Sequence, residues 1–366
     1  MIRVQGDPHT FETPQRVPMS SEANAKNVLH FDEPWDNPVF EAAGRFDKQA
    51  WLAGLHSKNG KYANQLRRVR AQVNRFAGYA LTKYYPHIGS EAGLSGSDLR
   101  ILIELQVEAG CNVVALPEPS RGCSVAEFAK NLETYWEFTS RLDTDVALMP
   151  YLHLGQDADR FKAKLEIIAE HEHALWCLGL VYASPLTYRP NYERIAEFGH
   201  RDLWIHCSGV RRYVSPQRPV SQLHSVQFFG VDSVAWGIPR PAPSAFAEGE
   251  GRSAPAPPPP PPSPASVRYF SRSGLDYPRM GDLCDGGKQL PCGCPACKSS
   301  TLEDTLAEFA SLGSGDDLET QARAFAKVHD VYASMAEFDV ARTEIAEDRL
   351  TKYYRAKPAM KAFLSL

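Results

Sequence analysis

The 366-residue chain lacks several features that would place it in a familiar class. It has no run of 18 apolar residues, so its sequence predicts no membrane-spanning helix. Its first 15 residues hold no apolar core of the kind that defines a secretory signal peptide. Cysteine is scarce, with 8 in the whole chain, and five of these are scattered like free thiols in a reducing compartment. Together these absences predict a soluble, cytoplasmic protein.

Neither sign of charge dominates. The chain carries 40 basic and 44 acidic residues, which gives a formal net charge of −4. A non-specific attraction of the whole surface to nucleic acid is therefore not expected, and any such binding must use local patches. The hydrophobic content of 43% suffices for one large core or two medium ones.

No glycine-rich phosphate-binding turn follows the first clear strand, which argues against a doubly wound dinucleotide fold. Instead, short apolar runs alternate with helical stretches from about 98 to 237. The predicted strands cover 112–116, 146–149, 176–181, 203–206 and 230–234. Because these runs are almost wholly apolar, we expect helices on both faces of a parallel sheet. The pattern predicts an α/β fold, a TIM-like (β/α)8 barrel that is irregular or shortened at its N-terminal strands.

Composition divides the chain into four parts. Residues 1–30 are polar and aperiodic and are expected to form a loose N-terminal arm. Residues 31–238 are expected to form the barrel. Residues 239–266 include six consecutive prolines at 257–262, which predicts an exposed polyproline II insertion, either a spacer or a docking segment. Residues 267–366 are expected to hold a zinc-binding insertion near the last strand, followed by C-terminal helices.

Three cysteines crowd into one short segment. Cys292, Cys294 and Cys297 follow a C-x-C-x-x-C spacing, and His329 follows on a predicted helix. Three thiolates and one imidazole fill the four corners of a zinc tetrahedron and leave no open position for a substrate. The sequence therefore predicts one structural zinc per chain. The alternative is a loop of reduced or disulfide-bonded cysteines, although such short spacings suit a disulfide poorly.

Beside this cysteine motif, two further segments carry a family resemblance. Gly230–Ser233 ends an apolar strand with Asp232, and the helix at 99–109 leads into a strand that ends near Glu118. With these motifs, residues 98–355 resemble the tRNA-guanine transglycosylase family, including its branch that inserts 7-deazaguanines into DNA. The resemblance implies a zinc-containing barrel enzyme of the pentosyltransferase class, commonly dimeric.

The resemblance also implies a reaction and its residues. Guanine in a nucleic acid, tRNA first of all, would be exchanged for a 7-deazaguanine base through a covalent intermediate on Asp232. A carboxylate at the carboxyl end of a barrel strand is suited to this attack, although an Asp there can equally cap a turn. Glu118 would accept hydrogen bonds from the base, or is a solvated loop carboxylate. The residues expected to line the base pocket are Gly155, Gln156, Gly179 and Leu180.

One departure keeps other functions open. The family uses a second carboxylate in an Asp-Ser-Gly turn, and this tripeptide occurs nowhere in the chain. The same chemistry on DNA is therefore one alternative, and a non-catalytic accessory subunit that binds nucleic acid is another. The expected partners are nucleic acid, a 7-deazaguanine base and a second subunit, in a homodimer or heteromer, and no membrane.

Overall fold

The structure is a computed structural model of the whole chain. It describes residues 2–3, 10–11, 13–29, 39–46, 54–57, 60–74, 81–88, 94–118, 123–141, 146–171, 175, 177–198, 203–215, 218–236, 264–284, 290, 292–298, 300–312 and 318–365. The proline-rich tract from 239 to 263 lies outside these residues.

An eight-stranded sheet forms the centre of the molecule, and every neighbouring pair in it is parallel. Its strands, in spatial order, are β3 (Gln15–Arg16), β12 (Ser233–Trp236), β9 (Trp204–Val210), β8 (Cys177–Val181), β7 (Ala147–His153), β6 (Val113–Leu116), β5 (Leu81–Ile88) and β4 (Val39–Phe46). The two edges meet, because Met19 just beyond β3 forms a parallel bridge with Glu41 of β4. The α/β fold with a parallel sheet is therefore confirmed, and its closure is consistent with a TIM-like barrel.

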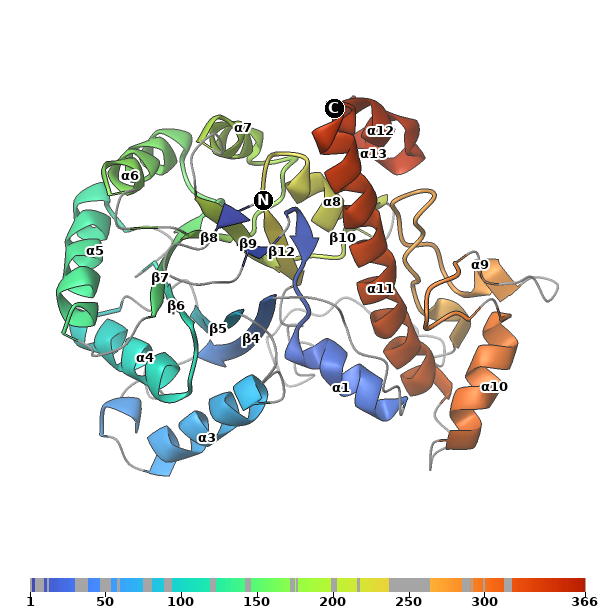
Figure 1. Cartoon of the computed structure of the whole chain (residues 1–366), viewed down its shortest axis with the longest axis horizontal. Helices are drawn as coiled ribbons and strands as arrows, with labels where there is room; N and C mark the ends of the chain where they lie inside the picture. The colour runs from blue at the N-terminus through green and yellow to red at the C-terminus, as the bar shows by residue number, and fades with distance from the viewer. Residues whose placement is uncertain are drawn as a thin grey trace, which may run out of the picture.

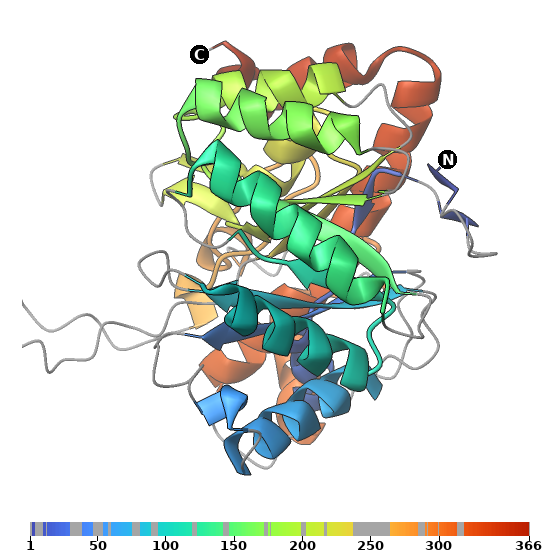
Figure 2. The same cartoon turned by 90° about the vertical axis from the view of Figure 1, so that its left-hand side faces the viewer.

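Helices surround this sheet in the order that a right-handed βα repeat dictates (Figures 1 and 2). They include α1 (Ser20–Val28), α3 (Gly60–Asn74), α4 (Gly96–Glu108), α5 (Val125–Thr139), α6 (Ala158–Glu170) and α7 (Arg189–Phe198). Ser95, Ser124 and Asp157 cap α4, α5 and α6 by accepting backbone N–H bonds in the first turn. After β9 come the hairpin β10 (Tyr213–Ser215) and β11 (Arg218–Ser221) and the short α8 (Gln222–Gln227).

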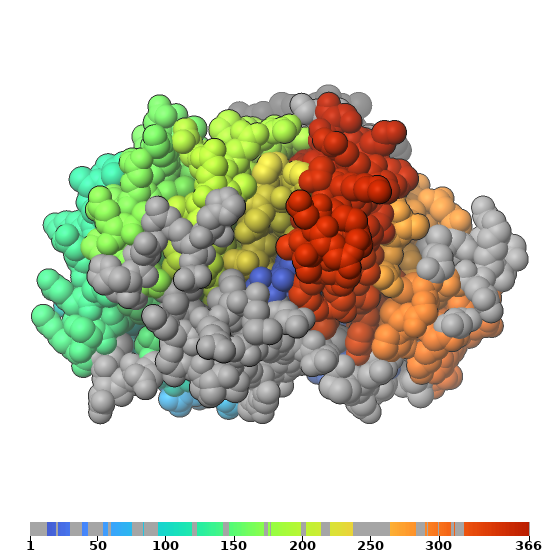
Figure 3. Space-filling model, turned by 45° about the horizontal axis from the view of Figure 1, so that its top comes forward, coloured from blue at the N-terminus to red at the C-terminus, as the bar shows by residue number. Residues whose placement is uncertain are grey.

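The segment after β12 adds a subdomain before the last barrel helix. It contains η1 (Pro264–Ser266), α9 (Gly281–Cys284) and α10 (Leu302–Leu312). The 29-residue α11 (Leu318–Ala346) then returns to the sheet, where it packs against α1 and β3. The short α12 (Leu350–Ala356) and α13 (Pro358–Leu364) follow it. In Figure 3 the red C-terminal helices lie between the yellow barrel segment and the orange subdomain.

The contact between α1, β3 and α11 joins segments from opposite ends of the chain. The Arg342 guanidinium on α11 donates a hydrogen bond of 2.8 Å to the carbonyl oxygen of Pro14. Helix α11 thereby supplies the eighth helix of the ring, although more than 80 residues separate it from β12.

Two expectations from the sequence are corrected here. Residues 15–28, expected to belong to a loose arm, form β3 and α1. The N-terminal strands differ in length, since β3 has two residues whereas β4 and β5 each have eight. The barrel also extends beyond residue 238, because α11 completes it. Another pair of short strands, β1 (Ile2–Arg3) and β2 (Thr10–Phe11), forms a separate two-stranded sheet.

Strand β6 shows how the core is built from strands that are covered on both faces. The residues of β6, Val113, Val114, Ala115 and Leu116, are all buried, as expected for a strand covered on both faces. The Gln106 side chain on α4 binds the same strand, accepting from the N–H of Ala115 at 2.8 Å and donating to its carbonyl oxygen at 2.9 Å.

None of the described helices combines the length and apolarity needed to cross a bilayer.

Candidate active site and metal centre

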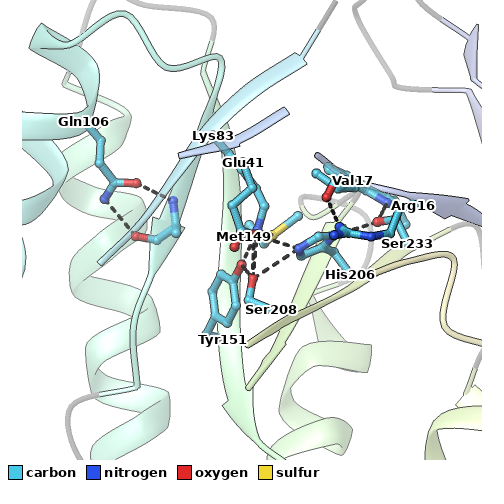
Figure 4. A network of polar contacts seen from close by, with 12 residues as sticks. Arg16, Val17, Glu41, Lys83, Gln106, Met149, Tyr151, His206, Ser208 and Ser233 are labelled. Carbon is cyan, nitrogen blue, oxygen red and sulfur yellow. Dashed lines mark hydrogen bonds and ion pairs between the residues drawn. The ribbon is translucent and has the colours of Figure 1, made fainter. Parts of the chain in front are cut away.

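Charged and hydroxyl side chains meet inside the closed sheet (Figure 4). Glu41 on β4 is the register partner of Lys83 on β5, so both side chains point to the same face. On the other side of the barrel, Tyr151, Gly179, His206 and Ser233 are successive register partners across β7, β8, β9 and β12. The two sets converge because the sheet closes on itself.

Glu41 is the hub of this interior cluster. One of its carboxylate oxygens, Oε2, accepts from Lys83 Nζ at 2.5 Å, from His206 Nε2 at 2.9 Å and from Ser208 Oγ at 2.7 Å. The other oxygen, Oε1, is buried and has no hydrogen-bond partner among the described residues. Burial alone would raise the pKa of Glu41, but Lys83 and the His206 hydrogen bond outweigh it and lower the pKa to about 2. Glu41 is therefore an anion.

Lys83 is fully buried, an unusual position for a lysine. Besides Glu41, its amino group donates to the Tyr151 hydroxyl and, at 3.1 Å, to Ser208 Oγ. Tyr151 and Ser208 are themselves 2.7 Å apart. Burial lowers the pKa of Lys83, and the charge of Glu41 opposes this shift without cancelling it. A lysine desolvated in this way is a better nucleophile than a solvated one.

His206 is held in one tautomer. The Trp204 indole N–H, which can only donate, binds Ser233 Oγ at 2.8 Å. The Ser233 hydroxyl hydrogen is then free to bind His206 Nδ1 at 2.7 Å, which leaves the imidazole hydrogen on Nε2, facing Glu41. Burial and the Lys83 charge lower the pKa of His206 to about 4, so the ring is neutral. His206 thus orients Glu41 and does not carry charge.

Gly179 makes room for Tyr151. A Cβ atom built on Gly179 would lie 2.5 Å from the Tyr151 ring, closer than any real contact. Gly179 and Leu180, both expected to line the base pocket, lie within β8. By the alternation of the strand, Leu180 points to the opposite face, toward the helices, where it is fully buried.

Glu118 and Gln156 meet in a second buried cluster. Each follows a strand, β6 and β7 respectively, and Lys164 on α6 joins them: it forms an ion pair with Glu118 and donates to Gln156 Oε1 at 3.0 Å. The Cys123 thiol donates to Glu118 at 3.4 Å and lies 3.2 Å from Lys164 Nζ. Glu118 also accepts from the backbone N–H of His153 at 2.9 Å. Burial raises the pKa of Glu118, and Lys164 opposes that shift.

These contacts correct the alternative that Glu118 is a solvated loop carboxylate. All four side chains of this second cluster, those of Glu118, Cys123, Gln156 and Lys164, are buried. The cluster fastens α6 to the carboxyl ends of β6 and β7. Gly155, which precedes Gln156, lies in the connection between β7 and α6.

Asp232 lies at the amino end of its strand. The sequence places it at the carboxyl end, but β12 begins one residue later, at Ser233. Its carboxylate Oδ2 accepts the backbone N–H of Ile205 at 2.8 Å, and its backbone N–H donates to the Ile205 carbonyl. Burial raises its pKa to about 6, against these hydrogen bonds. Because parallel strands share one direction, Asp232 lies at the end of the barrel opposite to the mouth where catalytic residues gather.

The cysteine motif and His329 form a cluster that could hold a metal ion. Ligand atoms of Cys292, Cys294, Cys297 and His329 all lie within 4.8 Å of one another. Cys294 Sγ is 3.5 Å from Cys297 Sγ, and the two sulfurs lie 3.3 and 3.1 Å from His329 Nδ1. A tetrahedral zinc with bonds of about 2.3 Å to sulfur and about 2.0 Å to nitrogen sets its ligands about 3.5–3.8 Å apart. The donor set and its spacing fit.

Surrounding groups prepare the imidazole for a metal. His329 Nε2 lies 2.8 Å from the carbonyl oxygen of Phe270, which can only accept, so the proton resides on Nε2 and Nδ1 presents a lone pair to the sulfurs. The Tyr269 ring stacks on His329 with centroids 3.8 Å apart, and its hydroxyl lies 3.1 Å from Cys297 Sγ. The cluster joins the loop at 292–298 to helix α11.

Comparison with known proteins gives limited similarity. No family model matches the chain, and no curated protein matches it. Among solved structures, a protein assigned as a lyase/mutase from Burkholderia cenocepacia is 13% identical, covering 63% of this chain and 78% of its own, with a TM-score of 0.40. A phosphonomutase assigned in the same organism is 15% identical, covering 61% and 85%, with a TM-score of 0.38. The homocysteine methyltransferase of Escherichia coli is 12% identical, covering 62% and 91%, with a TM-score of 0.37.

The expected family membership is corrected by this result. The similar structures include 2,3-dimethylmalate lyase, of the PEP mutase/isocitrate lyase superfamily, rather than a tRNA-guanine transglycosylase. The resemblance drawn from the motifs is therefore wrong, and so is the base-exchange function with tRNA or DNA that it implied.

The residues that the sequence missed are those of the interior cluster. Glu41 and Lys83 lie on β4 and β5, which no sequence pattern predicted as strands. The available signal was a charged residue near the start of a largely apolar or aromatic run, as with Glu41 in VFEAAGRF and Lys83 in LTKYYPHI. A buried residue whose pKa is shifted by desolvation and by a charged partner is a functional-site candidate.

Proposed function

We propose that this chain is a (β/α)8-barrel enzyme whose Lys83 amino group condenses with the carbonyl group of a small organic substrate. The observation that carries the proposal is a fully buried lysine with a lowered pKa, held between one carboxylate and two hydroxyl groups. Nucleophilic lysines depend on such desolvation. The product is an imine, which withdraws electrons from the neighbouring carbon and serves lyase-type cleavage or proton abstraction.

Each neighbour has a role in this step. The amine attacks the carbonyl carbon, and the carbonyl oxygen leaves as water after it has gained two protons. Tyr151 and Ser208, which contact both the lysine and one another, are placed to transfer these protons. Glu41 stays ionised and balances the positive charge of the protonated imine, while His206 fixes its orientation.

The metal cluster has a separate part in the proposal. Four protein ligands leave no open position, so the ion we propose there is one structural zinc per chain, which holds the subdomain to α11. Zinc bound in this way supplies folding energy and takes no part in the imine step. The expected nucleic-acid and second-subunit partners stay predictions.

Reductive trapping tests the proposal. The protein is incubated with a panel of small aldehydes and ketones in the presence of cyanoborohydride, which reduces an imine to a stable amine. We expect one adduct per chain by intact mass, located on Lys83 by peptide mapping, and at a rate well above that of the exposed Lys162.

Lys83→Met should abolish the adduct, whereas Lys164→Met should retain it. Lys164 is a matched control because it is equally buried and equally paired with a glutamate. Adducts spread over surface lysines, or an unchanged adduct in Lys83→Met, would refute the proposal. If a variant does not fold, mapping of the wild-type adduct decides the same question.

A further inference from the structure

The two oxygens of the Glu41 carboxylate differ in their hydrogen-bond partners. Three donors converge on Oε2, from Lys83, His206 and Ser208, whereas Oε1 has no partner among the described residues. The side chain is fully buried, and a carboxylate oxygen that is buried without a hydrogen bond is unfavourable. This oxygen, beside the proposed reactive amine, lacks a hydrogen bond that a bound ligand could supply.

We infer that the Lys83 site selects carbonyl compounds that carry a hydroxyl group on the carbon next to the carbonyl, and that Glu41 Oε1 accepts the hydrogen bond of that hydroxyl. This inference rests on the proposed function and adds the substrate class. The condensation forms the bond from Nζ to carbon and releases the carbonyl oxygen as water. The hydroxyl group is bound but is not consumed.

Charge decides the kind of group that Oε1 can bind. Glu41 is anionic, so a carboxylate or phosphate at this position would be repelled. A cationic group would be repelled by the positive charge of the protonated imine on Lys83, whose Nζ lies 2.5 Å from the other oxygen of the same carboxylate. A neutral O–H donor satisfies the orphan oxygen without either penalty.

Distance decides where the hydroxyl sits on the substrate. Both carboxylate oxygens belong to one side chain, and Oε2 is already in contact with Nζ. A carbon bonded to Nζ is therefore close to Oε1 as well. The hydroxyl-bearing carbon is bonded directly to the carbon attached to Nζ, so its hydroxyl can reach Oε1. A hydroxyl further along the substrate would reach Oε1 only if the substrate chain folded back.

Three ketones of similar size test the inference: hydroxyacetone, which donates a hydrogen bond, methoxyacetone, which only accepts, and acetone, which does neither. Trapping rates on Lys83 are divided by those on N-acetyl-lysine, which removes the intrinsic reactivity of each ketone. We expect the wild type to favour hydroxyacetone over methoxyacetone by about tenfold, the discrimination that corresponds to 1.4 kcal/mol.

Glu41→Gln replaces the hydrogen-bond acceptor at the Oε1 position by a donor. Because the Oε2 side is surrounded by donors, the glutamine carbonyl takes that side and the amide NH2 replaces Oε1. The preference should shift toward methoxyacetone, whose ether oxygen accepts. Glu118→Gln, in the other buried glutamate–lysine pair, should leave the wild-type preference unchanged.

The outcomes separate the two proposals. If no ketone gives an adduct on Lys83, the proposed function fails and the inference with it. If all three are trapped at equal normalised rates, the imine chemistry stands and the hydroxyl selectivity is refuted. If Glu41→Gln keeps the preference for hydroxyacetone, Oε1 is not the acceptor. The wild-type ratio alone decides the selectivity if Glu41→Gln does not fold, as thermal melting would reveal.

Discussion

Asp232→Asn should make the protein more stable at neutral pH, and the gain should depend on pH. The buried Asp232 carboxyl has a pKa of about 6 in the folded protein, against 3.8 for an unperturbed side chain. Between these values the folded chain binds more protons than the unfolded chain, so the free energy of unfolding falls as the pH rises. The loss is complete above about pH 6. A shift of two units corresponds to roughly 3 kcal/mol, which is an upper limit for this penalty.

Asparagine removes the penalty and keeps the useful contact, because its carbonyl oxygen can accept the same backbone N–H of Ile205. Urea denaturation of the two proteins between pH 4 and pH 8 measures the difference directly. We expect the variant to gain stability over the wild type as the pH rises from about 4 to 6, and to hold that gain above it.

Asp157→Asn is the control, since Asp157 caps the exposed start of α6 and asparagine caps helices equally well. Its effect on the free energy of unfolding should be small. A difference in unfolding free energy between Asp232→Asn and the wild type that does not vary with pH would refute the reasoning. A variant that is less stable than the wild type at pH 7 would refute it as well. Either result would show that burial does not raise the pKa of Asp232.

Three further predictions concern the other described contacts. Metal analysis should find about one zinc per chain, and Cys294→Ser should lose the metal together with several kcal/mol of stability, since binding at such a site is worth on the order of 10 kcal/mol; full zinc content in this variant would contradict the assignment. Gly179→Ala should lower the free energy of unfolding by about 1–3 kcal/mol in denaturant titrations, because the new methyl group overlaps the Tyr151 ring. Ser233→Ala should cost about 1–3 kcal/mol in the same assay, because the Trp204 N–H and His206 Nδ1 lose the hydroxyl between them, and Ser233→Thr should recover most of it.

The sequence predicted the later strands well and the earlier ones poorly, for a physical reason. Strands β6 and β8 are short and apolar on both faces, so their composition identifies them. Strands β4 and β5 carry Glu41 and Lys83 in their interior, which breaks the apolar pattern that marks a buried strand. The residues that hid these strands are the ones that form the candidate site, as expected where function opposes local folding rules.

The residues of the metal cluster lie close together in the sequence, whereas those of the interior cluster lie far apart. Three of the four metal ligands lie within six positions, so their spacing alone predicts the cluster. Glu41 and His206 are 165 positions apart and meet only because the sheet closes. Asp232 shows the opposite failure: a strand predicted at 230–234 begins at Ser233, and this small shift moves the carboxylate from the mouth to the far end.

The contact of α11 with β3 and α1 has a consequence for how the protein can be made and modified. The ring of strands is fastened by two segments that leave the ribosome at the start and near the finish of synthesis. The contact between them can therefore form only after α11 has emerged. A deletion of either residues 13–29 or α11 would remove one half of this contact rather than a peripheral element.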